Sequence, residues 1–258
     1  MDEHIQIPKS ILKPFSTVSH AVNDDGNPIK QNITYVLDVN GNIFPQDIKD
    51  CNINKGYYNL NSENHLAQCE TAFGDLKTKV LTDIKYGKAI SFDEKDINTV
   101  KRFFEVCKLR SPYLHIKLID KLKVMFPKVD FKEFQSHIVT NPPPINLIKN
   151  KDKLCVFYNK TDVNFLIPQC CWYLFGRRKQ ETLFMPISNN VALALCHRHK
   201  KDDRTVYPIL ESEIVDMLNC LAIYTEWNSN RQLIYAKFEN DLKRYIPFLE
   251  DFKNEIQI

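Results

Sequence analysis

The spacing of hydrophobic residues changes along the chain, and each change predicts a different kind of element. Strand-like runs, Tyr35 to Val39 and Asn42 to Phe44, flank Asn40-Gly41, which is typical of a β-hairpin because Asn-Gly tolerates the positive φ of a type I′ turn. Hydrophobic residues then recur at three- and four-residue intervals, as on the buried side of a helix. These intervals predict three helices: over about 62–86, behind a Ser91–Glu94 capping box to Cys107, and from Ser111-Pro112 to just before Pro127.

Three consecutive prolines, Pro142 to Pro144, cannot continue a helix and are typical of a stiff, extended connector. We therefore expect a single domain over residues 1–258, with a sub-boundary at the proline-rich connector 141–151. Beyond the connector the hydrophobic period becomes two, and stretches rich in β-branched and aromatic residues predict strands. These stretches are 153–158, 164–167, 182–187, 191–195 and 205–209.

Helical spacing returns near the end of the chain. Hydrophobic residues from Ile214 to Tyr224 predict one helix, and a second is expected from Ser229 to about Tyr245. The expected fold class is α+β, with an N-terminal β-hairpin, a helical middle, an antiparallel sheet and C-terminal helices.

The composition excludes several functional classes. Only six of the 258 residues are glycine, so neither a glycine-rich phosphate-binding loop nor the Gly-x-Ser-x-Gly turn of many hydrolases occurs. The longest largely apolar run, Phe165 to Phe175, is too short for a bilayer, which needs about 20 residues. The acidic N-terminus, with no apolar stretch behind it, is not a secretory signal. We therefore expect a cytoplasmic protein with no membrane partner.

The eight cysteines lie mostly within hydrophobic patterns, which favours reduced, buried thiols over a disulfide framework. Cys196-His197-Arg198-His199 has metal-ligating residue types, but neighbours on a strand point to opposite faces and the adjacent cations would repel a metal ion. We therefore expect no metal and no cofactor. His65 and Cys69 lie one helical turn apart, which suits either a nucleophile with its base or a structural pair at the rim of the core.

Positive charge is concentrated in one part of the chain, although the net charge is only +3. Between Gly176 and Thr205 there are seven Lys and Arg residues and three acidic ones. A local basic region attracts phosphate, and the alternative interpretation is a pair of solvated turns. The candidate nucleic-acid-binding residues are Arg177, Arg178, Lys179, Arg198, Lys200 and Lys201.

A second group of candidates consists of polar residues in hydrophobic surroundings. Glu70 lies beside the apolar stripe of the first predicted helix, where a carboxylate needs a cationic partner such as Arg110 or shifts its pKa upward. Asn219 lies in an otherwise apolar run, so its amide either binds backbone or faces a pocket, and Arg231 follows it. These residues predict either a structural network or an active site, provided that they meet in one cleft.

Five short motifs are spread over nearly the whole chain. They are Pro8, Leu12 and Phe15 near the start, Asn54–Tyr58 followed by Glu70, Arg110-Ser111-Pro112, Pro186-Ile187-Ser188, and Asn219 with Arg231. Their types and order resemble those of a mostly bacterial family of domains of unknown function (the 4238 group). The resemblance supports the fold and selects Glu70, Arg110, Ser188, Asn219 and Arg231 as candidate catalytic residues, but it names no activity. Two positions depart from the family pattern: Ile5 replaces a histidine, and Gln169 falls where an acid is expected.

The basic region and the polar candidates favour a cytoplasmic effector that engages RNA or another phosphate-bearing ligand. Its more specific form is a ribonuclease-type factor in phage defence, acting as a metal-independent nuclease or other hydrolase. Glu70 would accept the proton of an attacking 2′-hydroxyl, and Arg110 or Arg231 would stabilise the charge that develops on the phosphate. The alternative is a non-catalytic protein-interaction module, with a partner protein docked near Trp172 and Tyr173. The sequence does not define the oligomeric state.

Overall fold

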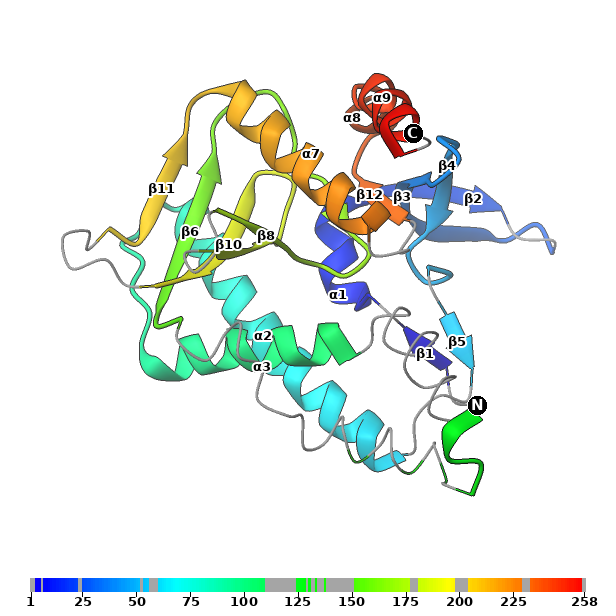
Figure 1. The fold of residues 1–258 in the computed structure, drawn as a ribbon, viewed down its shortest axis with the longest axis horizontal. Coiled ribbons are helices and arrows are strands. Elements are labelled where there is room, and N and C mark those ends of the chain that lie inside the picture. The colour runs from blue at the N-terminus through cyan, green and yellow to red at the C-terminus, as the bar shows by residue number, and fades with distance from the viewer. Residues whose placement is uncertain are drawn as a thin grey trace.

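A computed structural model of the chain describes residues 3–5, 7–22, 25–51, 53–55, 60–109, 124–128, 130, 133, 137, 151–176, 181–197, 204–228 and 233–256. Two five-stranded sheets occupy the two halves of Figure 1, with helices against both. The predicted α+β class is confirmed. None of the helices in the described part of the chain combines the length and the apolar character needed to cross a bilayer.

The first sheet has the strand order β11-β6-β10-β9-β8. Its strands are β6 (Lys153–Asn159), β8 (Tyr173–Phe175), β9 (Thr182–Pro186), β10 (Val191–Cys196) and β11 (Val206–Ile209). All neighbours are antiparallel except β11, which runs parallel to β6. The predicted antiparallel sheet is confirmed apart from this edge, where the chain passes β6 after leaving β10 and adds β11 on its far side.

Helices cover both faces of the first sheet, because successive side chains along its strands point to opposite sides. Leu154, Val156, Leu193 and Leu195 join the hydrophobic core formed with α2 (Leu60–Lys85) and α3 (Glu94–Leu109). Cys155, Phe184, Ala192 and Ala194 join a separate core beneath α7 (Ser212–Asn228). The result is three layers, with α7 on one side of the sheet and α2 and α3 on the other (Figure 1).

The second sheet is built around β3 (Pro28–Asp38), which pairs with β2 (Thr17–Val22), β4 (Ile43–Asp47) and β12 (Leu233–Ala236). β12 in turn pairs with the short β7 (Ile167–Pro168). A third core packs α8 (Glu239–Lys243) and α9 (Ile246–Ile256) against this sheet through Leu242, Tyr245 and Leu249. The remaining elements are α1 (Lys9–Leu12), the 3₁₀ turn η1 (Lys13–Phe15), and the strand pair β1 (Glu3–Ile5) and β5 (Ile53–Lys55).

The predicted hairpin around Asn40-Gly41 is confirmed as the turn between β3 and β4. Gly41 has a φ of 89°, a conformation that costs glycine little. The Asp38 carboxylate accepts hydrogen bonds from the backbone N–H groups of Asn40 and Asn42, both at 2.9 Å. Burial acts to raise the pKa of Asp38, but the hydrogen bond from the Asn42 side-chain amide, together with these backbone bonds, outweighs it and lowers this pKa.

Two predicted details are wrong. The helix expected from Ser229 to Tyr245 is replaced by β12 and α8, because residues 233–236 are buried between β3 and β7 and therefore lack the alternation of a half-exposed strand. The capping box of α3 is formed by Asp93 and Asp96 instead of Ser91 and Glu94. Asp93 Oδ1 accepts the Asp96 N–H at 2.8 Å, and Asp96 Oδ2 accepts the Asp93 N–H at 3.4 Å.

Other expectations fall partly or wholly outside the described residues. Of the proline-rich connector 141–151, only Lys151 is described. Of the helix expected after Ser111-Pro112, only residues 124–126 are described. The eight cysteines form no disulfide, as predicted, and five of them are buried.

Candidate functional site

The first sheet gathers five strand termini at one end. Its register pairs Lys153, at the start of β6, with Cys196, at the end of β10. It also pairs Phe175, the last residue of β8, with Thr182, the first residue of β9. β11 begins at the same end, because it runs parallel to β6 and its first residue, Val206, pairs with Val156. We call this end, with Lys151, Lys153 and Arg204, the basic end; it lies at the left of Figure 1.

The register also explains why the two basic segments, which flank β9 and β10 in the sequence, attach to strand ends at the basic end. Residues 177–180 connect β8 to β9, and residues 198–203 lie between β10 and β11. The candidate phosphate-binding residues themselves lie outside the described residues: Arg177, Arg178, Lys179, Arg198, Lys200 and Lys201. The strands to which both segments attach, however, place their ends beside each other.

Two cations of the basic end are gathered around one aromatic ring. Lys153 Nζ donates a hydrogen bond to the Tyr207 hydroxyl at 3.0 Å and lies 5.6 Å from the centre of its ring. The Arg204 guanidinium lies 4.9 Å from the same ring centre. Tyr207 in turn stacks on Phe157, with ring centres 5.4 Å apart. Cation–π attraction thus holds two positive charges near each other on a rigid aromatic support.

Lys151 attaches the chain before β6 to the start of β9. Its side chain is buried, and its ammonium group donates a hydrogen bond to the carbonyl of Glu181. Burial lowers the pKa of Lys151, while the negative charge of Glu181 acts in the opposite direction. Lys151 therefore stabilises the basic end from within, whereas Arg204 is exposed to solvent at its surface.

Glu70 lies half-buried on α2 and lines a surface cavity of about 390 Å³ beside α1. Ser10, Asp75 and Lys77 also line this cavity. The buried ammonium group of Lys77 donates a hydrogen bond to the Ser10 carbonyl, and its pKa is lowered to about 8 by burial and by the nearby charge of Lys13. Arg110, the predicted partner of Glu70, lies outside the described residues.

Asn219 is fully buried on α7, and its amide links three segments of the chain. Its oxygen accepts the Leu166 N–H at 2.9 Å. Its nitrogen donates to the Asn164 carbonyl at 2.8 Å and to the Tyr245 hydroxyl at 2.7 Å. Because both its donor and its acceptor atoms bind neighbouring segments, Asn219 acts as a structural latch.

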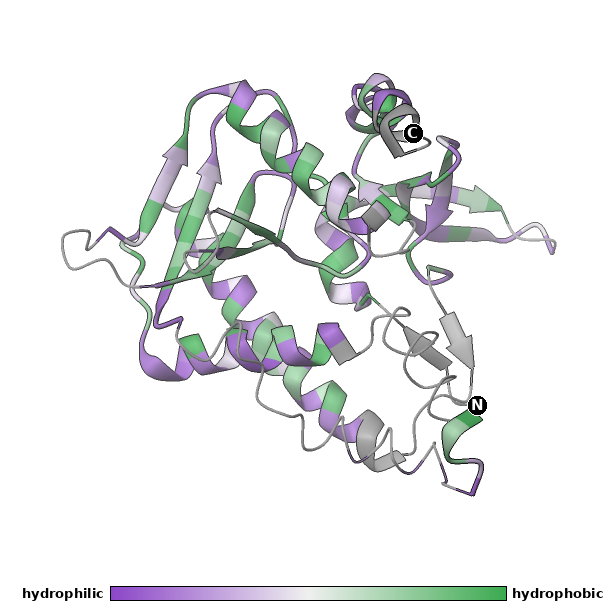
Figure 2. Ribbon diagram, viewed as in Figure 1, coloured by the Kyte–Doolittle hydropathy of each residue, from purple (hydrophilic) through white to green (hydrophobic). Residues whose placement is uncertain are grey.

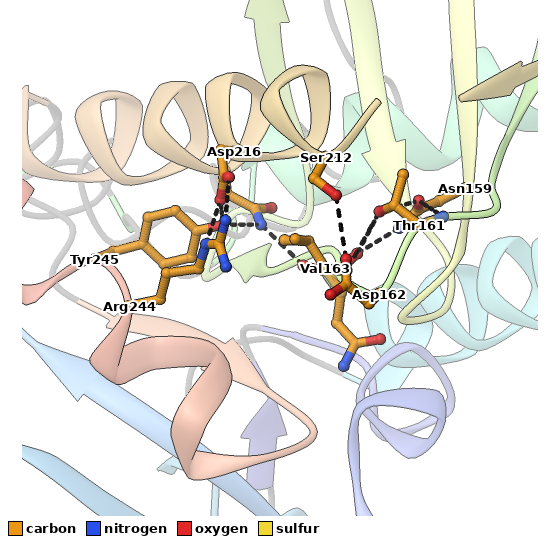
Figure 3. Close-up of polar contacts among 10 residues, drawn as sticks. Asn159, Thr161, Asp162, Val163, Ser212, Asp216, Arg244 and Tyr245 are labelled. Carbon is orange, nitrogen blue, oxygen red and sulfur yellow. Dashed lines mark hydrogen bonds and ion pairs between the residues drawn. The ribbon is translucent and has the colours of Figure 1, made fainter. Parts of the chain in front are cut away.

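Tyr245, which accepts a hydrogen bond from Asn219, also contacts an ion pair between α7 and the segment that joins α8 to α9 (Figure 3). The Tyr245 hydroxyl donates to Asp216 Oδ1 at 2.7 Å, and the Arg244 guanidinium binds both oxygens of Asp216, at 2.7 and 2.5 Å. Burial would raise the pKa of Asp216, but the hydrogen bonds from Arg244 and Tyr245 outweigh it and lower this pKa. A two-point Arg–carboxylate contact fixes orientation, so this contact holds the C-terminal helices against α7.

Ser188 belongs to the turn between β9 and β10. Its hydroxyl donates to Asn190 Oδ1 at 2.9 Å and accepts the backbone N–H groups of Asn190 and Val191. Ser188 is also buried, so its hydroxyl closes the turn.

The described candidates do not share a cleft. Glu70 lies on α2 and Asn219 on α7, and these helices cover opposite faces of the first sheet (Figure 1). Ser188 lies in a strand turn and binds only its own turn among the contacts of the described residues. Arg231, like Arg110, lies outside the described residues.

Cys69 and Arg102 line a groove of about 560 Å³ between α2 and α3, and His65 contacts both residues. His65 Nε2 is 3.7 Å from Cys69 Sγ and 2.5 Å from an Arg102 guanidinium nitrogen, and Arg102 also forms an ion pair with Glu105. Burial and the charge of Arg102 lower the pKa of His65, which favours the neutral imidazole. Because Arg102 donates to the same ring nitrogen that faces Cys69, this nitrogen is a poor base for the thiol.

The predicted docking surface near Trp172 and Tyr173 is wrong, because both side chains are buried. Trp172 packs edge-to-face against Phe104 of α3, and Tyr173 packs against Phe184 beneath α7. Within the described part of the chain, no three His, Cys, Asp or Glu side chains are placed to hold a metal ion.

Comparison with known proteins adds no relative: no protein-family model, no curated protein and no solved structure matches the chain. The resemblance to the 4238 group therefore stays a prediction. The evidence for the basic end as a site is therefore its geometry. Lys153, and the Tyr207 ring that it contacts, were not among the candidate residues predicted from the sequence. Lys153 begins a predicted strand and Tyr207 lies within another, but only strand pairing brings them together.

Proposed function

We propose that the protein binds RNA, or another phosphate-bearing ligand, at the basic end of the first sheet. The observation that carries the proposal is the strand register, which brings the ends of both basic segments to Lys153 and Arg204. Phosphate groups are bound by clustered Lys and Arg side chains, and RNA offers many phosphates along one strand. A cluster formed by several chain segments attracts phosphate more strongly than either basic segment alone.

The geometry supports binding more strongly than cleavage. Glu70, the predicted proton acceptor, lines a cavity with Asp75 and Lys77 beside α1, and none of the described cations of the basic end lines that cavity. Asn219 and Ser188 are occupied by structural hydrogen bonds. A ribonuclease-type role in phage defence would require RNA cleavage. Incubation of total RNA with the parent protein and with Glu70→Gln tests that more specific form, and identical RNA ladders would exclude a catalytic Glu70.

Binding is best measured by fluorescence anisotropy with a labelled single-stranded RNA at several salt concentrations. The double variant Lys153→Ala/Arg204→Ala should weaken binding by about tenfold, or about 1.4 kcal/mol. It should also make the slope of log Kd against log salt shallower by about 1 for each phosphate group that the variant no longer binds. Inorganic phosphate as a competitor distinguishes recognition of phosphate alone from recognition of a strand.

The matched control removes two cations from the other half of the molecule. Lys237 lies after β12 and contacts the Phe238 ring, and the exposed Lys243 lies on α8. Lys237→Ala/Lys243→Ala changes the net charge by the same amount as the first double variant. An equal loss of RNA affinity in both double variants would contradict a site at the basic end, and so would affinity that does not depend on salt.

A second candidate function, self-association, is favoured by the outer side of α7. Ile214, Met217 and Tyr224 are exposed, and with the partly buried Leu221 they follow the three- and four-residue spacing of a helix–helix contact. Hydrophobic residues occupy much of α7 in Figure 2. The occupant we propose is α7 of a second copy, packed antiparallel, because this orientation keeps the acidic side chains of Glu211 and Glu213 apart.

Light scattering after size-exclusion chromatography tests this second candidate. The parent should show a concentration-dependent dimer, and Met217→Lys should remain monomeric without loss of stability, because the Met217 side chain is exposed. A monomeric parent over the whole concentration range would contradict self-association through α7.

A further inference from the structure

Two of the eight thiols lie side by side at the basic end. Cys155 is on β6 and Cys196 is the last residue of β10, and their sulfur atoms are 3.9 Å apart. The register explains the contact, because Cys155 pairs with Ala194 and Cys196 with Lys153, which makes the cysteines diagonal neighbours across adjacent strands. We propose that a peroxide oxidises this pair to a reversible intramolecular disulfide.

Closing the disulfide requires the end of β10 to move towards β6, because diagonal neighbours have Cα atoms about 7–8 Å apart and disulfides span about 4.4–6.8 Å. A disulfide has a sulfur–sulfur distance of about 2.05 Å, so the two sulfur atoms must approach by about 2 Å. Cys196 is the terminal residue of its strand, where the backbone can adjust more easily than in the middle of a sheet. The pair also differs in accessibility, since Cys155 is buried and Cys196 is only half-buried. An oxidant therefore reaches Cys196 first.

The electrostatic surroundings assign the two thiols different roles. The hydrogen bond from Cys155 lowers the pKa of Cys196, burial opposes this effect, and the positive charges of Lys153 and Lys151 add to the lowering. The pKa of Cys155 is raised by its hydrogen bond to Cys196 and by burial. Cys196 is thus the thiolate that attacks the peroxide, and Cys155 is the thiol that completes the disulfide.

The reaction balances in two steps. The Cys196 thiolate attacks one oxygen of hydrogen peroxide, the O–O bond breaks, and hydroxide leaves as Cys196 becomes a sulfenic acid. The Cys155 sulfur then attacks the Cys196 sulfur, the S–O bond breaks, and water leaves with the proton of the Cys155 thiol. Two thiols lose two electrons in total, and the peroxide is reduced to water. A dithiol reductant reverses the change by thiol–disulfide exchange.

A second pair of thiols serves as an internal control. Cys171 is fully buried and its thiol is hydrogen-bonded to the thiol of Cys107, and both side chains lie in the core between the first sheet and α3. Burial raises the pKa of Cys171 well above its ordinary value, so a peroxide finds neither access nor a thiolate there. We expect this pair to remain reduced under conditions that oxidise Cys155 and Cys196.

The test exposes the folded protein to hydrogen peroxide, blocks the remaining thiols after unfolding, and identifies linked peptides by mass spectrometry. The expected product joins Cys155 to Cys196, weighs two hydrogen atoms less, and disappears with dithiothreitol. Cys155→Ser should instead accumulate a sulfenic acid at Cys196, trapped by dimedone, and Cys155→Ala provides a second version in case the serine is poorly tolerated.

Two results would overturn the proposal. The first is a Cys196 that stays reduced while Cys107 or Cys171 is oxidised. The second is equal trapping of the Cys196 sulfenic acid in the parent and in the Cys155 variants, which would show that Cys155 does not complete a disulfide. Neither result depends on RNA binding, so the disulfide and the proposed function are tested separately.

Discussion

At the scale of single residues, buried polar side chains in this protein serve the fold. Asn219 could be predicted from the sequence as a buried amide, because it interrupts an apolar run. Its partners could not be predicted, since Leu166, Asn164 and Tyr245 come from distant segments that meet only in the folded chain. The same holds for Glu70: its half-buried position follows from helical spacing, whereas its cavity beside α1 depends on tertiary packing.

Asn219→Ala should lower the free energy of unfolding by about 3 kcal/mol, because it leaves a backbone N–H and a carbonyl without partners in a buried place. Urea unfolding followed by circular dichroism measures the loss. Thr225→Ala on the same helix is the matched control, since among the described residues its hydroxyl donates only to the Leu221 carbonyl of α7, and it should cost less than about 1 kcal/mol. Equal losses in the two variants would contradict the latch.

Asp216 predicts a pH dependence. Its pKa is lowered in the folded protein, so its contribution to stability is present above the pKa of the unfolded chain, about 3.9. That contribution is lost as the pH falls through the lower folded value. Asp216→Asn should therefore destabilise the protein at pH 7, and the difference from the parent should shrink below about pH 4. Urea midpoints at a series of pH values provide the measurement, and a constant difference would exclude the ion pair with Arg244 as its cause.

At the scale of elements, local patterns predicted the long helices α2, α3 and α7 and several strands, whereas short elements and strand order depended on tertiary pairing. The stretches 153–158, 182–187 and 191–195 are confirmed as β6, β9 and β10 with small changes at their ends. β12 was missed, because a short strand buried between two neighbours has no alternation to reveal it. The parallel pairing of β11 was missed for a related reason, since strand order is a property of the whole sheet.

The start of α3 gives a prediction at this scale. Asp93→Ala should cost about 1 kcal/mol, because the helix loses the acceptor of its first-turn N–H group. Ser91→Ala should be nearly neutral, although the sequence pattern alone assigns the cap to Ser91. Thermal or urea unfolding of the two variants side by side checks this assignment, and a larger loss for Ser91→Ala would reverse it.

At the scale of the whole molecule, the three-layer arrangement separates the candidate residues that were expected to meet. α2 with Glu70 and α7 with Asn219 lie on opposite sides of the first sheet, so these two do not form a single centre. The same sheet instead brings to one end the strand termini to which the two basic segments attach. The sequence predicted the local charge, but only the pairing of β6, β8, β9, β10 and β11 shows that both segments attach at one end.

In the proposed RNA site, the basic segments 177–180 and 198–203 bind the same RNA. The direct test is an RNA titration at fixed salt with two triple variants, Arg177→Ala/Arg178→Ala/Lys179→Ala and Arg198→Ala/Lys200→Ala/Lys201→Ala, repeated at a second salt concentration. A shared site predicts that each triple variant raises Kd by at least about tenfold, makes the salt dependence shallower and keeps one RNA per protein. A triple variant that binds RNA with the affinity and salt dependence of the parent would contradict a shared site.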